Sequence, residues 1–107
     1  MQWSFTYVSA EAKAELDALP RDMRASFEHI VKLVQAMGLE RVHEPYIKHI
    51  EDRLWEMRLR GRDGIARSLY VTASGRRVVI LRTFVKKTQK TPRREIELAR
   101  KRAQEVV

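Results

Sequence analysis

The stretch LWEMRLRGRDGIARSLYVTASGRRVVILRTFV, residues 54–85, decides the fold of this chain. Apolar and polar side chains alternate in it, as they do along a strand that is buried on one face. Three strand patterns are separated by two turn signals: residues 54–60, 65–72 and 77–85, with GRDG at 61–64 and Ser74-Gly75 between them. Glycine-containing turns of this length join antiparallel neighbours. The stretch therefore predicts a three-stranded antiparallel meander.

The residues before the meander predict one strand and two helices. Trp3–Val8 alternates aromatic with hydroxyl side chains and is available as a fourth strand. Ser9 is a helix N-cap signal, and Pro20 both ends the first helix and opens the second. The second helix carries an apolar stripe up to Gly38, a natural stop. We expect the two helices to form an antiparallel hairpin over one face of the sheet.

A lysine-rich segment and a helix follow the third strand of the meander. Lys86, Lys87 and Lys90 lie on a short tether, and Thr91 and Pro92 are signals for the N-cap and the first helical position. The helix carries a narrow apolar stripe: Ile96, Ala99, Ala103 and Val106. This pattern predicts a short C-terminal helix that docks on the sheet.

Length and composition restrict the class of protein. A chain of 107 residues supports one core, so we expect a single domain over residues 1–107. The absence of cysteine excludes a disulfide framework, a thiolate zinc site and thiol catalysis. The N-terminus lacks the pattern of a signal peptide, and no apolar run reaches the roughly 20 residues of a membrane span. We expect a cytoplasmic protein with no membrane partner.

The predicted elements together indicate an α+β fold. Two N-terminal helices would pack on a small, twisted antiparallel sheet of about four strands, and the short C-terminal helix would complete the fold.

Positive charge is concentrated in the second half of the chain. The net charge is +8, but residues 1–52 carry six Lys/Arg and nine Asp/Glu, whereas residues 53–107 carry sixteen and five. An uneven distribution of this kind gathers the basic groups on one face and favours a polyanionic partner, above all nucleic acid. The alternative is a solvated basic surface that only confers solubility.

The alternation within the strands also groups charged side chains. Trp55, Met57 and Leu59 point to one face, so Glu56, Arg58 and Arg60 share the other (residues 54–60). On the next strand, Arg67 lies where a structural design would place an uncharged residue. Glu56 is the candidate partner of Arg67 across the hairpin. The two residues either form a structural ion pair without a function or belong to a functional site. The basic residues nearby outnumber Glu56, which favours a net positive site.

The order of the segments LWEMRLR, GIARSLY and ILRTFVKKTQKTPRREIELA resembles the phage-derived HigB-like branch of the RelE/ParE toxin superfamily. Its members typically read L-x-E-[LM]-R, G-x-x-R-x-[LV]-Y and F-x-K-K-[ST]-x-K-[TI]-P in that order, and the resemblance covers roughly residues 54–104. The resemblance implies a small α+β toxin that cleaves mRNA in a ribosome-dependent manner. It also implies a cognate antitoxin, in this branch usually a helix-turn-helix protein.

The resemblance further implies roles for individual residues. In such chemistry the 2′-hydroxyl attacks the adjacent phosphate, so the enzyme must orient that phosphate, neutralise the growing charge and protonate the leaving oxygen. Arginine forks and lysine point charges suit these tasks, and a phenylalanine can stack on a base. The expected catalytic residues are Arg58, Arg67, Lys87 and Glu56, and the expected RNA-binding residues are Arg60, Phe84, Lys86 and Lys90. We expect no metal and no other cofactor, because no His/Asp/Glu cluster has ligand spacing.

The chain departs from many members of the superfamily at the proton-transfer groups. Those members carry a Tyr or His near the C-terminus, whereas residues 86–107 contain neither. His29 falls on the surface of the second helix, and His43 and His49 lie in the link before the meander, where each either reaches the site or has no role. Glu56 serves either as a base or to orient a neighbouring arginine.

Two other functions fit the sequence. One is a ParE-like toxin, which shares the fold but poisons DNA gyrase through protein contacts. The other is a basic nucleic-acid-binding module without catalysis, which would explain the charge but not the arginines within the sheet. The arginines and lysines favour the ribonuclease.

Overall fold

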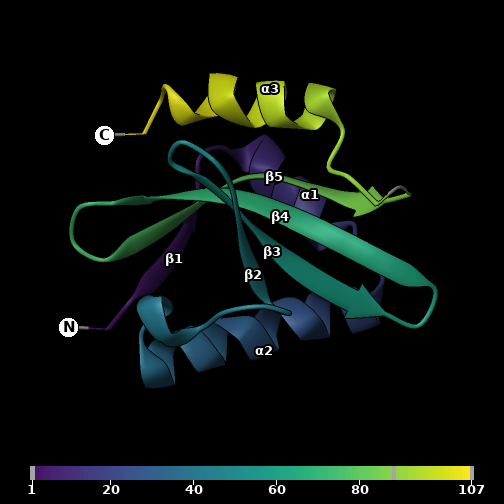
Figure 1. Ribbon diagram of the computed structural model, residues 1–107, viewed down its shortest axis with the longest axis horizontal. Helices are drawn as coiled ribbons and strands as arrows, with labels where there is room; N and C mark the ends of the chain where they lie inside the picture. The colour runs from purple at the N-terminus through teal and green to yellow at the C-terminus, as the bar shows by residue number, and fades with distance from the viewer. Residues whose placement is uncertain (1, 88, 107) are drawn as a thin grey trace.

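The computed structural model describes residues 2–87 and 89–106. Its elements, in chain order, are β1 Ser4–Tyr7, α1 Ala10–Asp17, α2 Arg21–Met37, the 3-10 turn η1 Leu39–Arg41, β2 Ile47–Glu51, β3 Leu54–Gly61, β4 Gly64–Ala73, β5 Arg77–Lys86 and α3 Arg93–Ala103. One five-stranded sheet of order β1-β5-β4-β3-β2 forms the middle layer. Figure 1 shows α2 on one side of this sheet and α3 on the other. Within the described ranges, no helix is long and apolar enough to cross a membrane.

The structure corrects the predicted fold class, because the sheet is mixed rather than antiparallel. β1 precedes both N-terminal helices and pairs parallel with β5, from Ser4 opposite Arg77 to Tyr7 opposite Ile80. The chain passes from β1 through α1 and α2 to the opposite edge of the sheet, and three reversals then return β5 in the direction of β1. A parallel edge follows from this path.

The structure also contains a strand, β2, where we expected a link. Its sequence IKHIE pairs antiparallel with β3, with a register shift between His49 and Glu51. A short strand that contains a bulge does not alternate cleanly between apolar and polar residues, so periodicity alone does not reveal it. The sheet therefore has five strands rather than about four.

The locally encoded elements agree with their predictions. The three strands of the meander match the predicted ranges to within one residue at each end. The Ala12 N–H donates to the Ser9 hydroxyl at 3.1 Å, which caps α1. Gly38 ends α2 with a φ of 92°, a conformation that suits glycine. These elements depend on nearby residues, and the sequence signals them directly.

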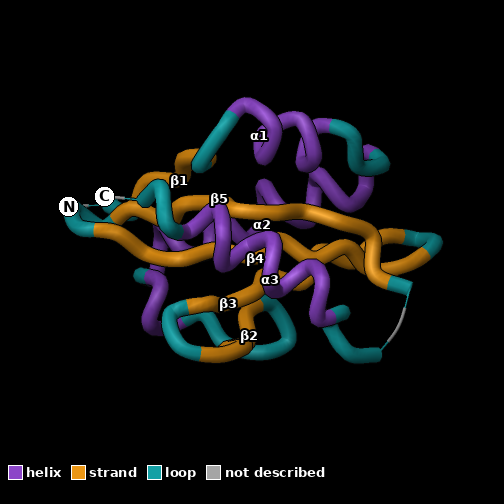
Figure 2. Tube along the Cα trace, turned by 90° about the horizontal axis from the view of Figure 1, so that it is seen from above, coloured by secondary structure: helices purple, strands orange, loops and turns teal. Residues whose placement is uncertain are grey.

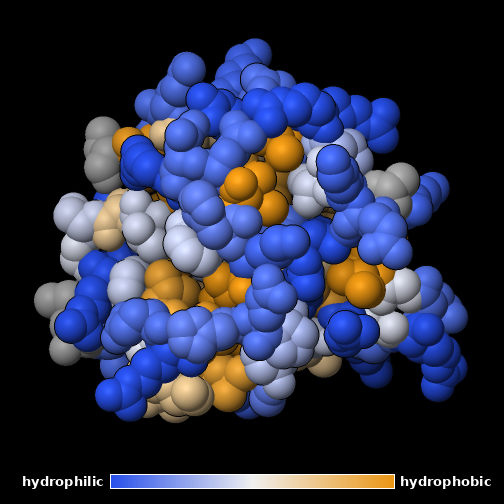
Figure 3. Space-filling model, in the orientation of Figure 1, coloured by the Kyte–Doolittle hydropathy of each residue, from blue (hydrophilic) through white to orange (hydrophobic). Residues whose placement is uncertain are grey.

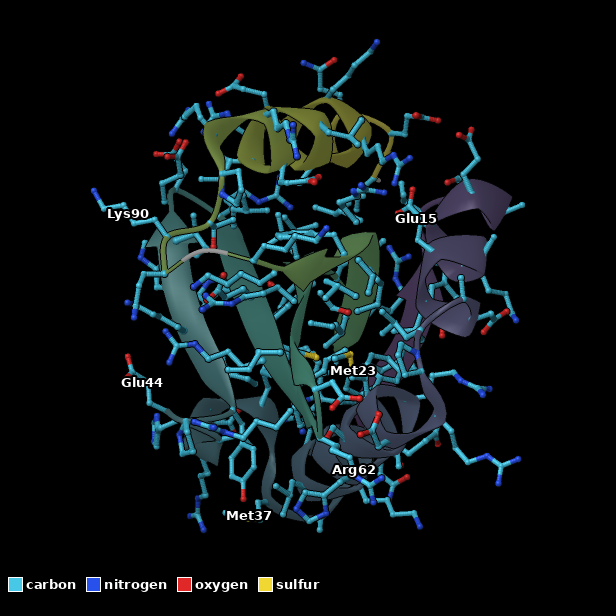
Figure 4. All side chains as sticks on the ribbon, turned by 90° about the vertical axis from the view of Figure 1, so that its right-hand side faces the viewer. Glu15, Met23, Met37, Glu44, Arg62 and Lys90 are labelled. Atoms are coloured by element: carbon cyan, nitrogen blue, oxygen red, sulfur yellow. The ribbon has the colours of Figure 1, made fainter. Side chains whose placement is uncertain are left out.

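Two hydrophobic cores lie on the two faces of the sheet. The first packs α1 and α2 against the sheet through Leu16, Phe27, Ile30, Met57 and Tyr70, among others. Met23 belongs to this core and lies between α2 and the strands (Figure 4). The second packs α3 through Leu69, Leu81, Ile96 and Ala99, among others. Outside these cores the surface in Figure 3 is mostly hydrophilic, and apolar side chains show in recesses.

Ion pairs on both flanks position α3, which contributes two buried apolar side chains, Ile96 and Ala99. On one flank, Glu15 of α1 accepts from Arg102 of α3 at 2.8 and 2.9 Å. On the other flank the ion pairs reach the end of β2: Arg93 to Glu51 at 2.6 Å, Arg100 to Glu51 at 2.8 Å and Arg100 to Asp52 at 2.7 Å. Figure 2 shows α3 lying across the strands. Its fixed position also places Thr91, which lies just before it.

Candidate functional site

A buried carboxylate, that of Glu56 on β3, is the centre of the candidate site. Its side chain has no solvent exposure. Oε2 accepts from Nη1 of Arg67 and, at 3.4 Å, from Nε of Arg58. Oε1 accepts from the Thr91 hydroxyl at 2.8 Å. Both oxygens therefore bind groups of the protein itself, and the carboxylate is held in one orientation.

Glu56 joins two arginines that lie directly opposite each other. Arg58 on β3 and Arg67 on β4 are paired residues in the antiparallel register. Like charges in this arrangement repel, and a carboxylate between them offsets the repulsion. Alternation along β3 places Glu56 and Arg58 on the same face, and the β3–β4 register adds Arg67 to it. The predicted contact between Glu56 and Arg67 is confirmed.

Arg67 is almost completely buried, with 6% of its surface exposed. Burial lowers the pKa of its guanidinium, the nearby Arg58 acts in the same direction, and Glu56 opposes the shift. A guanidinium remains protonated in a protein. Its buried Nε has no hydrogen-bond partner among residues 2–87 and 89–106. Buried donors are normally paired, so this N–H is an unsatisfied donor within the cluster.

A pocket of about 290 Å³ opens above these residues. Side chains from three strands and from the segment before α3 line it: Lys48, Glu56, Arg58, Arg67, Lys90 and Thr91. Glu51 also borders the pocket, but its carboxylate is held by Arg93 and Arg100. The cations of the pocket outnumber its carboxylates, so an anion is the complementary ligand.

Lys86, at the end of β5, belongs to the same cluster of charges. Alternation places it on the face of Phe84, which is the residue opposite Arg67. Burial lowers the pKa of Lys86, the charges of Arg67, Arg58 and Lys48 lower it further, and Glu56 opposes them. Lys86 therefore releases its proton more readily than an ordinary lysine.

A family model described as Phage derived protein Gp49-like (DUF891) matches residues 14–104. The chain belongs to this Gp49-like family. The family is placed in the RelE/ParE-like toxin superfamily, so the resemblance is confirmed at that level. Membership in this family is consistent with a role as the toxin of a toxin–antitoxin module, but it does not identify a specific activity. No curated protein matches the chain.

The remaining predicted site residues of this Gp49-like chain lie at different distances from the pocket. Lys90 lines it, on the side of the molecule away from Glu15 in Figure 4. Phe84 is half-buried against the α3 core. Lys87 follows the end of β5 and is exposed, and Arg60 lines a separate hollow beside α2.

The pocket residues that were not among the predicted site residues include Lys48 and Thr91. Lys48 is the register partner of Glu56, so its side chain shares that face of the sheet. Because IKHIE was interpreted as a link, no signal placed Lys48 there. Thr91 was predicted to cap α3, but Pro92 occupies the N-cap and no side-chain hydrogen bond caps the helix. The Thr91 hydroxyl binds Glu56 instead. Thr88, in the same segment, lies outside the described residues.

The histidines of the Gp49-like chain do not supply an evident proton donor to the pocket. His49 borders the pocket, but its ring packs 4.8 Å from Trp55, and its Nε2 lies 2.7 Å from the Asp52 carbonyl oxygen. His43 lines an apolar hollow elsewhere, and His29 is exposed on α2. In the described part of the chain, no group of three His, Asp or Glu side chains is arranged to hold a metal ion.

Proposed function

We propose that this chain is the toxin of a type II toxin–antitoxin module, of the HigB-like branch, and that it cleaves ribosome-bound mRNA. One observation carries the proposal: the buried Glu56 aligns Arg58 and Arg67 within a pocket whose cations exceed its carboxylates. A phosphodiester fits this pocket in charge and in hydrogen bonding, because arginine forks bind two phosphate oxygens at once.

The two arginines would orient the phosphate and stabilise its transition state. The 2′-hydroxyl attacks the phosphorus as its proton passes to water, and the bond to the 5′-oxygen breaks to leave a 2′,3′-cyclic phosphate. Negative charge grows on the phosphate oxygens in between. The guanidinium groups are already aligned by Glu56, so they need little reorganisation during the reaction. Arg58, whose side chain lines the pocket and is 22% exposed, would donate to one of these oxygens. Removal of one such donor typically costs about 2.7–4 kcal/mol in the barrier.

Lys86 is the group that we assign to protonation of the leaving 5′-oxygen. Its lowered pKa makes it a better acid than an exposed lysine, and it lies on the face of Arg67. Lys87, to which the resemblance gave a catalytic role, would contact RNA phosphates at the rim instead, together with Lys90. Glu56 would act as a positioning residue, because its two oxygens are occupied by Arg58, Arg67 and Thr91.

Among residues 2–87 and 89–106, the site contains no evident general base, which would make the protein a poor nuclease on free RNA. Holding the reacting groups in line lowers the activation barrier by about 7–11 kcal/mol in favourable cases. The ribosome would supply this by fixing the mRNA in the decoding site. The dependence on the ribosome then follows from the side chains that the pocket offers.

The partner that we propose is a cognate antitoxin of the helix-turn-helix type. An acidic segment laid over the basic pocket would neutralise it most directly and associate in a salt-sensitive manner. Hydrogen exchange on the complex tests this: we expect protection of the segment before α3, whereas protection confined to residues 9–37 would exclude coverage of the pocket.

Expression of the chain from a tightly regulated promoter tests the proposed activity in cells. Primer extension on a transcript from induced cells should show discrete cuts, and growth should stop. Lys86→Met should remove both effects, whereas Lys101→Met, the same change at an exposed position on α3, should retain them. Intact transcripts together with trapped gyrase–DNA complexes would instead identify a gyrase poison and overturn the proposal.

A further inference from the structure

A second hollow, of about 430 Å³, lies beside the candidate site between α2 and β3. Its lining includes Arg58 and Arg60 of β3, His29 of α2, and Tyr46. Arg58 also lines the pocket around Glu56, so the two hollows meet at this side chain. The volume falls within the roughly 300–1,000 Å³ that small-molecule sites occupy.

The start of β2 at Ile47 explains why the two hollows meet. The pairing of β2 with β3 reaches Met57, and the Arg58 N–H then donates to the Tyr46 carbonyl at 2.8 Å. Further along β3, the Ser26 hydroxyl of α2 donates to the Arg60 carbonyl at 2.5 Å. The edge of β3 is thus bordered by a loop and a helix instead of a strand. Arg58 therefore lies at an open edge of β3, where its side chain borders both hollows.

The chemistry of the second hollow matches an unpaired nucleobase with its phosphate. Tyr46 is 37% exposed, and its ring lies edge-to-face with His29 at 5.9 Å. Ile30 contributes apolar surface, while Arg58 and Arg60 add positive charge. The Asp22 carboxylate also borders the hollow, and it accepts from the Arg62 N–H at 2.5 Å. Single-stranded RNA is bound in this way, with bases on aromatic rings and phosphates on cations.

We propose that this hollow is a nucleobase subsite, which binds the base of a nucleotide next to the phosphate held by Arg58 and Arg67. Arg60 contacts the phosphate of that nucleotide. The inference rests on the proposed function, since it extends the path of the same RNA strand. It also gives the enzyme a means to discriminate among bases, because an aromatic-walled pocket holds a base at a fixed distance from the cleaved bond.

Binding of a short RNA tests the subsite without any cleavage. The probe is a fluorescent 2′-O-methyl hexanucleotide, which lacks the attacking hydroxyl, compared with versions in which one position at a time is abasic. Measured by anisotropy at low salt, one abasic position should raise the Kd of the wild-type protein by roughly five- to a hundredfold. Tyr46→Ala should abolish this difference, and Tyr46→Phe should keep it. Met37→Ala, an exposed apolar residue at the end of α2, is the matched control and should behave as wild type.

The outcomes separate this proposal from the proposed function. Equal Kd values for all probes, or no binding of the intact probe, would overturn the subsite even if the protein cuts mRNA on programmed ribosomes. A base dependence that Tyr46→Ala removes would support the subsite even if no message is cut, and the proposed activity would then fail alone. Loss of antitoxin binding by Tyr46→Ala with unchanged RNA binding would assign the hollow to a protein partner and overturn the proposal.

Discussion

Replacing Glu56 with Gln removes the negative charge that lies between Arg58 and Arg67 while keeping the size of the side chain. Breaking a buried ion pair by removing one partner costs about 3–5 kcal/mol. Glutamine retains one acceptor oxygen for the arginines, so we expect the lower end of that range, about 3 kcal/mol. For a domain of this size each kcal/mol corresponds to about 4–8 °C, so the melting temperature should fall by roughly 12–24 °C.

Urea unfolding followed by circular dichroism measures the loss of stability from Glu56→Gln. Glu97→Gln is the control, because Glu97 is an exposed carboxylate paired with Arg93 at 2.6 Å, and the change should cost less than about 1 kcal/mol. Adding Arg67→Met to Glu56→Gln should recover part of the loss by removing the unpaired buried charge. A Glu56→Gln protein as stable as wild type would refute the view that Glu56 holds the site together.

Two further predictions concern the basic rim and the α3 anchor. Changing Lys86 and Lys87 together to Gln should reduce the slope of log Kd for RNA against log salt by on the order of one to two units, measured by anisotropy titrations. An unchanged slope would show that neither lysine contacts RNA phosphates. Burial raises the pKa of Glu15, but the hydrogen bond from Arg102 and the charge of Arg82 outweigh it, so the pKa lies below 4.5. A carboxylate whose pKa is lowered by folding stabilises the folded state at pH values above its pKa in the unfolded state. This stabilisation is lost as the pH falls through its pKa in the folded state. The free energy of unfolding should therefore fall below about pH 4.5. Urea titrations at about pH 7 and about pH 3 should show a smaller loss for Glu15→Gln than for the wild-type protein. An equal loss in both proteins would contradict this.

Local signals determined which parts of the fold the sequence revealed. The turns at 61–64 and at Ser74-Gly75 separate strands whose alternation is clear, so the meander was predicted correctly. The direction of β1 depends on the path of the whole chain, and no residue within Ser4–Tyr7 encodes it. β2 is short and contains a bulge, so its pattern resembled a link.

The site was predictable to the extent that it depends on one hairpin. Glu56 and Arg67 lie on adjacent strands, and period-two alternation places them on one face. Thr91 lies 35 residues after Glu56 and reaches it only because α3 docks where it does. The lowered pKa of Lys86 also arises from packing, since burial is its main cause. Contacts between distant segments therefore account for what the sequence did not reveal.

Primer extension on a defined mRNA, incubated with the purified protein either free or on programmed ribosomes, tests the central claim most directly. We predict discrete cuts in the codon at the decoding site, little cleavage of free mRNA, and loss of the cuts with Arg58→Ala or Lys86→Met. Intact mRNA on the ribosome, or cuts that persist in both variants, would contradict it.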